Sequence, residues 1–141
     1  MLNELLHNII TQSIPKRNSI LFVDDEIICH DVVNLVLGYT TNYKVVNTYN
    51  AAEAIILAEK FNKTLGLIFI DILLSDMNGY QLYKILKANE NIAHIPIVFQ
   101  SGITVQIREI RELIENQQAD IIHKPYKNDE LINIVGKYMP K

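Results

Sequence analysis

The sequence predicts an α/β fold in which helices cover both faces of a doubly wound parallel sheet. Strand-like and helix-like patterns alternate along the chain, and the strand-like runs are almost entirely apolar, as strands buried on both faces are. Polar groups stand at the ends of four of these runs, which is where ligands bind in an open parallel sheet. The chain has 141 residues, so one domain accounts for its length.

Each predicted element has a local cause in the sequence. Helices are indicated by apolar residues that recur every three or four positions, and strands by short runs of β-branched and aromatic residues. We expect Gly38 to end the first helix of the domain, Asn50 to cap the second, and Asp76 to Gly79 to form a turn. The predicted strands are residues 20–23, 43–48, 66–70, 96–100 and 120–123, and the predicted helices are residues 26–37, 51–61, 80–88, 105–114 and 131–138.

The polar groups at the ends of these runs are expected to converge at one edge of the sheet. Asp24 and Asp25 follow the first run, Asp71 ends the third, Ser101 ends the fourth and Lys124 ends the fifth. Carboxylate oxygens are the ligands that a hard divalent cation prefers, and such a cation neutralises charge on a phosphoryl group. The pattern therefore predicts a pocket for a hard divalent cation and a phosphoryl group.

Simpler interpretations exist for some of these residues. The acidic pair could cap the following helix, which is compatible with metal binding. The hydroxyl could be an ordinary strand end, and the lysine a surface residue in the turn before Pro125. Asp71 has the weakest alternative, because an unpaired carboxylate at the end of so apolar a run would be costly to bury.

In their order and spacing, these motifs resemble those of the receiver domain of bacterial two-component response regulators. The resemblance covers about residues 19 to 138, nearly the whole chain. It implies a flavodoxin-like, five-stranded parallel sheet in the order 2-1-3-4-5 with five helices. We accordingly expect a stand-alone receiver domain over residues 19–141, preceded by an N-terminal helix and linker over residues 1–18.

The resemblance also implies roles for the site residues. Asp71 would accept the phosphoryl group, Ser101 would act as a switch hydroxyl, and Lys124 would be aimed inward by a cis bond to Pro125. The cofactor would be Mg²⁺. Its implied ligands are Asp24 (chiefly through a metal-bound water), Asp25, Asp71 and the backbone carbonyl of Leu73.

Some positions depart from the family pattern. Many receivers carry an aromatic residue three positions before the lysine, and its side chain swings inward on phosphorylation. This chain has Ile121 at that position, so we do not expect its output signal to depend on such an aromatic side chain. Leu73 and Ile103 occupy the two variable positions that flank the site. Because neither side chain can orient a water molecule, we expect a long-lived aspartyl phosphate.

The expected function is a phosphorylation-dependent signalling switch that alters the binding of a partner. We expect no enzymatic role beyond Mg²⁺-dependent self-phosphorylation and slow self-dephosphorylation. The expected phosphodonor is a histidine kinase or a histidine phosphotransfer protein. An aspartyl-phosphate phosphohydrolase is the alternative from another class, although such enzymes carry a second acid where this chain has Leu73. A flavin-binding electron carrier is disfavoured, because no loop is rich enough in Ser, Thr and Gly to hold a nucleotide phosphate.

Composition narrows the class of protein further. A net charge of −3 provides no electrostatic basis for binding nucleic acid. The single Cys29 excludes an internal disulfide, and the first residues do not resemble a signal peptide, so a cytoplasmic protein is expected. No apolar run is long enough to span a membrane.

The N-terminal segment lies outside the resemblance and reads as a short amphipathic helix. Such a helix is marginal alone and must bury its apolar stripe. Packing on its own domain and contact with a partner or a second copy, as in a homodimer, both remain open. A membrane anchor is disfavoured, because no Lys or Arg precedes Lys16. The stripe consists of Leu2, Leu5, Leu6, Ile9 and Ile10.

Overall fold

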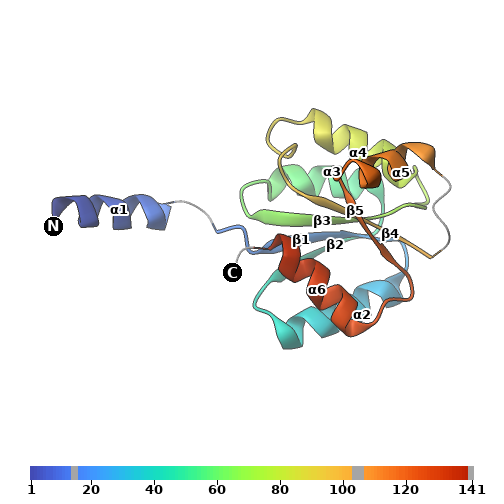
Figure 1. The fold of residues 1–141 in the computed structure, drawn as a ribbon, viewed down its shortest axis with the longest axis horizontal. Coiled ribbons are helices and arrows are strands. Elements are labelled where there is room, and N and C mark those ends of the chain that lie inside the picture. Colours follow the sequence, from blue (N-terminus) through green and yellow to red (C-terminus); the bar gives the residue numbers. More distant parts are fainter. Residues whose placement is uncertain (14–15, 103–106, 140–141) are drawn as a thin grey trace.

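The predicted alternation of strands and helices is present in the computed structural model, which describes residues 1–13, 16–102 and 107–139 (Figure 1). The strands form one five-stranded parallel sheet in the order β2-β1-β3-β4-β5, which confirms the predicted topology. In chain order the elements are α1 (Leu2–Ser13), β1 (Ser19–Val23), α2 (Ile27–Thr40), β2 (Lys44–Thr48), α3 (Ala51–Lys60), β3 (Leu65–Asp71), α4 (Gly79–Ala88), β4 (Ile97–Ser101), α5 (Arg108–Glu115), β5 (Asp120–His123) and α6 (Asn128–Tyr138).

Two layers of helices enclose the sheet. Every residue of β1, β3 and β4 is buried, because successive side chains point to opposite faces and both faces are covered. Helices α2 and α6 pack on one face, and α3, α4 and α5 pack on the other (Figure 1). The α2/α6 face carries Ile20, Phe22, Leu67, Phe69, Val98 and Ile122.

Several element ends differ slightly from the prediction. The hydroxyl of Ser101 and the carboxylate of Asp71 belong to the last residues of β4 and β3, so ladder hydrogen bonds help to fix both positions. Asn50 caps α3 as predicted, its side chain accepting a hydrogen bond from the Glu53 N–H group. Helix α5 begins at Arg108, and the predicted earlier start near residue 105 lies outside the described residues.

The predicted end of α2 at Gly38 is wrong. The helix continues to Thr40, and the carbonyls of Val36 and Leu37, near its C-terminal end, accept hydrogen bonds from the hydroxyls of Thr40 and Thr41. An interior glycine costs only about 1 kcal/mol relative to alanine, and packing of the rest of the helix offsets this. Gly38 therefore marks no boundary.

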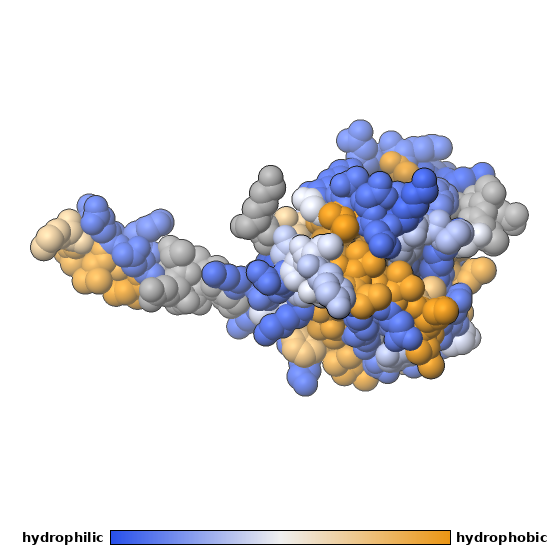
Figure 2. All heavy atoms as spheres, turned by 90° about the horizontal axis from the view of Figure 1, so that it is seen from below, coloured by the Kyte–Doolittle hydropathy of each residue, from blue (hydrophilic) through white to orange (hydrophobic). Residues whose placement is uncertain are grey.

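The apolar pattern that predicted α2 is mostly not part of the core. The buried residues of this helix are His30, Val33, Val36 and Leu37. Figure 2 views the molecule from the side on which α2 and α6 lie and shows hydrophobic side chains gathered there. We define the α2 apolar face as Ile27, Ile28, Val32, Leu35 and Tyr39, which are exposed by 67, 68, 42, 61 and 86%.

Helix α1 forms as expected but extends away from the sheet (Figure 1). Residues 1–10 are all exposed, including the apolar stripe, so the structure does not show α1 packed on its own domain. Across residues 1–13, 16–102 and 107–139, no helix combines the length and apolar character needed to cross a membrane.

Candidate functional site

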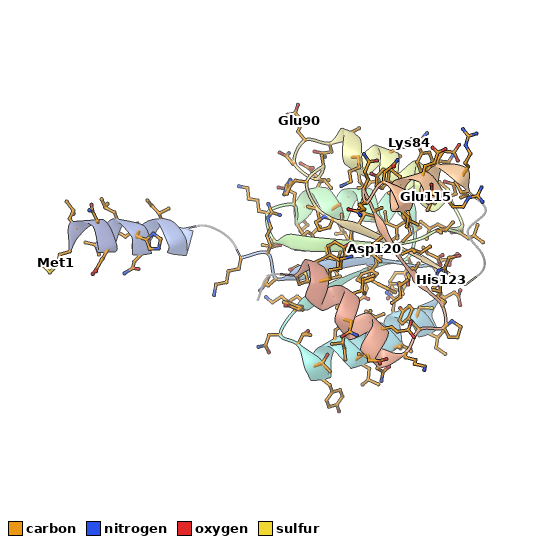
Figure 3. All side chains as sticks on the ribbon, in the orientation of Figure 1. Met1, Lys84, Glu90, Glu115, Asp120 and His123 are labelled. Atoms are coloured by element: carbon orange, nitrogen blue, oxygen red, sulfur yellow. The ribbon has the colours of Figure 1, made fainter. Side chains whose placement is uncertain are left out.

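The carboxyl ends of β1, β3, β4 and β5 meet at one edge of the sheet, at the opposite end of the molecule from α1. Figure 3 shows this separation through the labelled Met1 and His123, the last residue of β5. The ammonium nitrogen of Lys124 lies 2.6 Å from Asp24 Oδ2 and 3.0 Å from Asp71 Oδ2. The fold thus brings together three of the predicted site residues from three different strand ends.

Asp71 is a buried acid, only 6% exposed. Burial raises the pKa of its carboxyl to about 6, because desolvation disfavours the charged form more than the Lys124 ammonium and the Leu73 N–H group favour it. Burial also acts to lower the pKa of Lys124, but its hydrogen bonds to both carboxylates outweigh this and raise that pKa above its ordinary value. Asp71 is therefore harder to ionise than an exposed aspartate, whereas Lys124 stays charged.

Asp24 is fully buried and accepts hydrogen bonds on both carboxylate oxygens. Its Oδ1 accepts from the Glu26 N–H group at 2.9 Å, just before α2 begins, and its Oδ2 accepts from Lys124 and from Gln100 Nε2. The N-cap residue of α2 is Glu26, which makes no side-chain cap hydrogen bond, so the bond to Asp24 closes the turn before the helix and does not cap it. The capping interpretation of the acidic pair is therefore wrong, and Asp24 belongs to the site.

The donor set of this edge suits a hard divalent cation. Asp24, Asp25, Glu26 and Asp71 each offer a carboxylate oxygen, and these atoms all lie within 4.8 Å of one another. Asp25 and Glu26 are exposed at the rim. Four crowded carboxylates beside the Lys124 ammonium carry an excess of negative charge, which a cation with oxygen ligands relieves. The residues present therefore fit Mg²⁺, with Glu26 as an acid that sequence reasoning did not include.

The loop between β3 and α4, which carries Leu73, is held at both ends. The Gly79 N–H group donates to the Ile72 carbonyl at 2.7 Å. Both carboxylate oxygens of Asp76 accept hydrogen bonds at 3.0 Å from N–H groups in the first turn of α3. These contacts keep Leu73 next to Asp71.

Ser101 and the bond between Lys124 and Pro125 also lie at this edge. Ser101 is 3% exposed, and its carbonyl accepts a hydrogen bond from the Lys124 N–H group at 2.7 Å. The cis bond between Lys124 and Pro125 is confirmed. Ile121 is half-buried against the core on the α3, α4 and α5 side. Ile103 lies outside the described residues.

Sequence reasoning missed two buried polar contacts of Asp24. Gln100 donates to its carboxylate, and the signal for this was an amide directly after three apolar residues of the strand. His30 is 1% exposed; its Nε2 lies 2.7 Å from the Asp24 carbonyl and its Nδ1 2.7 Å from Asn47 Oδ1. Its place in the helix carried no comparable signal, because only the fold brings it beside β1 and β2.

A cleft of about 440 Å³ opens beside the site, between α2 and the segment that joins β5 to α6. Its lining includes Ile28 and Val32 of the α2 apolar face, together with Lys124, Pro125 and Tyr126. An apolar surface therefore runs from α2 to the ammonium that contacts Asp71.

Comparison with known proteins gives consistent results. The family model for the response regulator receiver domain matches residues 20–136. The two-component response regulator ORR12 of Oryza sativa subsp. japonica is 28% identical over 117 residues, which are 83% of this chain and 94% of that protein. Sensory transduction protein LytT of Bacillus cereus is 29% identical over 119 residues, 84% of this chain. The chain spans about half of the length of LytT, 46%.

Solved structures show the same fold. Chemotaxis protein CheY4 of Vibrio cholerae superposes with a TM-score of 0.74 at 21% identity, covering 86% of this chain and 98% of that one. The receiver domain of sensor histidine kinase PA1611 from Pseudomonas aeruginosa, solved with a magnesium ion in its active site cleft, has a TM-score of 0.73 at 25% identity, with 86% and 96% covered. The flavodoxin-like architecture is thereby confirmed.

Proposed function

We propose that this chain, which belongs to the family of response regulator receiver domains, accepts a phosphoryl group on Asp71 and so works as a switch in two-component signalling. The observation that carries the proposal is the placement of buried Asp71 at the carboxyl edge, 3.0 Å from the Lys124 ammonium and inside a cluster of carboxylates. This arrangement provides a nucleophile and a fixed cation for a phosphoryl oxygen.

The chemistry follows from the groups present. A carboxylate oxygen of Asp71 attacks the phosphorus of a phosphohistidine, the P–N bond breaks, and the imidazole leaves with the bonding electrons. Both reactants are anionic, so the Lys124 ammonium lowers their repulsion. Bound Mg²⁺ would supply further neutralisation of the transferring oxygens. Asp25, Asp71 and the Leu73 carbonyl would hold it, with Asp24 further out.

The surface next to the site supports a protein phosphodonor, namely a histidine kinase or a histidine phosphotransfer protein. The α2 apolar face is exposed and continuous with the cleft that reaches Lys124. An apolar helix laid in such a groove is a common mode of protein recognition. We place the donor there, with its phosphohistidine directed at Asp71.

The output surface is proposed on α5, β5 and α6, where the binding of an unidentified partner would change. The hydrogen bond from the Lys124 N–H group to the Ser101 carbonyl joins the ends of β5 and β4, so movement of either residue reaches this surface. Half-buried Ile121 replaces the aromatic residue of many receivers, and an aliphatic side chain there supports output that does not depend on an aromatic side chain.

Phosphorylation of Asp71 is tested with a small acyl phosphate and Mg²⁺, followed by intact-protein and peptide mass spectrometry. We expect one phosphoryl group on the wild type and on Asp31→Asn, a control at an exposed aspartate of α2, and none on Asp71→Asn. Phosphate on Asp71→Asn would contradict the proposal. Repeated turnover of a phosphomonoester would instead indicate the phosphohydrolase alternative.

The docking surface is tested with matched lysine substitutions. Ile28 in the α2 apolar face and Ile56 on α3 are both 68% exposed, so Ile28→Lys and Ile56→Lys differ only in location. We expect Ile28→Lys alone to slow transfer from a phosphohistidine protein that phosphorylates the wild type. Transfer from the small acyl phosphate should be equal in both variants. Equal slowing of protein transfer in both variants would contradict this surface.

A further inference from the structure

Strand β4 carries a buried amide that the phosphoryl-transfer chemistry described above does not use. Gln100 is 0% exposed and lies in register with Asp71 on the neighbouring strand, so it belongs to the last row of side chains before the site. Ile97, Val98 and Phe99, which precede it in β4, are all apolar. An amide in such a place is costly unless its hydrogen bonds are made.

Both ends of the Gln100 amide have partners. Its Nε2 donates to Asp24 Oδ2 at 3.0 Å, and its Oε1 accepts a hydrogen bond from the Tyr126 hydroxyl at 3.4 Å. A carboxylate can only accept, so the amide nitrogen must face Asp24, and the orientation of the amide follows from this chemistry. The shorter bond, to a charged acceptor, is the stronger of the two.

The carboxylate of Asp24 is consequently held from three directions. One donor is the Glu26 N–H group, just before α2. The other two are the Lys124 ammonium, just after β5, and the amide of Gln100 in β4. The Lys124 ammonium also donates to Asp71 Oδ2 at 3.0 Å, so this donor is divided between two carboxylates. Gln100 keeps Asp24 in place whichever acceptor Lys124 favours.

We propose that Gln100 is a positioning residue for the cation site and acts through Asp24, an inference that rests on the proposed function. Lys124 holds Asp24 by cancelling its charge, which opposes cation binding. Gln100 is neutral, so it fixes the carboxylate and leaves the negative charge available to a divalent cation. Loss of an outer partner of a metal ligand typically weakens metal binding about 10- to 100-fold, and because Asp24 would itself stand further out than the ligands, we expect the loss of Gln100 to lie at the lower end of this range.

The test is a calorimetric titration with Mg²⁺, in the absence of phosphodonor. Gln100→Met keeps an unbranched side chain of similar size and removes the donor, and we expect it to bind Mg²⁺ about 10-fold more weakly than the wild type. Asp24→Asn provides the second arm of a double-mutant cycle. If Gln100 acts through Asp24, the double variant should bind Mg²⁺ no more weakly than Asp24→Asn alone, whereas additive losses would overturn the proposal.

A matched packing control separates positioning from a merely structural role. Val98 precedes Gln100 by two residues and lies on the same face of β4, where it packs in the α2/α6 core. We expect Val98→Ala to lower the melting temperature without changing Mg²⁺ affinity. Equal losses of affinity in Val98→Ala and Gln100→Met would overturn the proposal. The titration contains no phosphodonor, so its result does not depend on whether Asp71 can be phosphorylated. Failure of Asp71 to accept a phosphoryl group in the mass spectrometry experiment would bear on the proposed function alone.

Discussion

Single residues in the site balance the cost of burial against ion pairing. Asp71 illustrates this balance, since burial raises its pKa to about 6 although Lys124 donates to it. Between the ordinary aspartate pKa and this value, the folded protein binds more protons at Asp71 than the unfolded chain does. The contribution of Asp71 to stability therefore falls as the pH rises through that range.

Asp71→Asn should accordingly stabilise the protein in metal-free buffer near neutral pH. The amide removes a buried charge and can still accept from Lys124, so we expect a gain on the order of 1 kcal/mol, roughly 3 °C in Tm. The gain should shrink below about pH 5, where Asp71 itself is protonated. Thermal melts across pH measure this. A lower Tm for Asp71→Asn near neutral pH would mean that the ion pair outweighs the cost of burial.

Leu73 bears on the lifetime of the phosphorylated state. Its side chain is 59% exposed two residues after Asp71 and offers no hydrogen bond to an attacking water. We expect Leu73→Asn to lose phosphate severalfold faster than the wild type when purified phosphoprotein is followed in Mg²⁺. Leu73→Met, which stays apolar, should decay at the wild-type rate. Equal rates for the Asn variant and the wild type would contradict a role for Leu73.

At the scale of elements, the junction between β3 and α4 depends on a close backbone approach. A Cβ atom on Gly79 would lie 2.8 Å from the Asp71 carbonyl oxygen, so the end of β3 and the start of α4 fit only around glycine. We expect Gly79→Ala to cost about 1 to 3 kcal/mol in denaturant unfolding. Gly136→Ala is the matched control, because a Cβ there meets nothing within 4 Å inside α6. It should stabilise by up to about 1 kcal/mol.

Helix α1 makes a different prediction, because its apolar stripe is exposed. Residues 1–10 are all exposed, so we expect removal of residues 1–13 to leave the Tm of the domain within about 1 °C of the wild type. A drop of several degrees would show that α1 packs on its own domain in solution. Light scattering on the same samples tests the homodimer, since deletion of a self-associating helix lowers the molar mass.

At the scale of the whole molecule, cation binding and folding are linked. Carboxylates gathered from distant parts of the chain repel one another only once the fold is formed, so Mg²⁺ should stabilise the folded state. A concentration 100 times the Kd should add about 2.7 kcal/mol. We expect a rise in Tm for the wild type and Asp31→Ala, and none for Asp25→Ala or Asp71→Ala. A rise in Tm with Mg²⁺ in both Asp25→Ala and Asp71→Ala, equal to that of the wild type, would exclude the site.

Sequence alone determined the layout of this protein. Periodicity predicted the alternation of strands and helices, because this signal is local and repeats along the chain. The polar residues at the strand ends predicted that Asp71 and Lys124 lie at one edge of the sheet. Periodicity predicted α2 equally well but could not say which of its faces is buried. His30 and Val33 face the core, while Ile28 and Leu35 do not.

Only the tertiary structure decided the contacts between residues far apart in the chain. The amide of Gln100 meets Asp24 across 76 positions, and Lys124 meets the same carboxylate across 100. Strand order and register set such encounters, and the pairing of strands depends on the packing of the whole core rather than on any local pattern. The burial that raises the pKa of Asp71 has the same origin, because a side chain loses its water only when distant elements close over it.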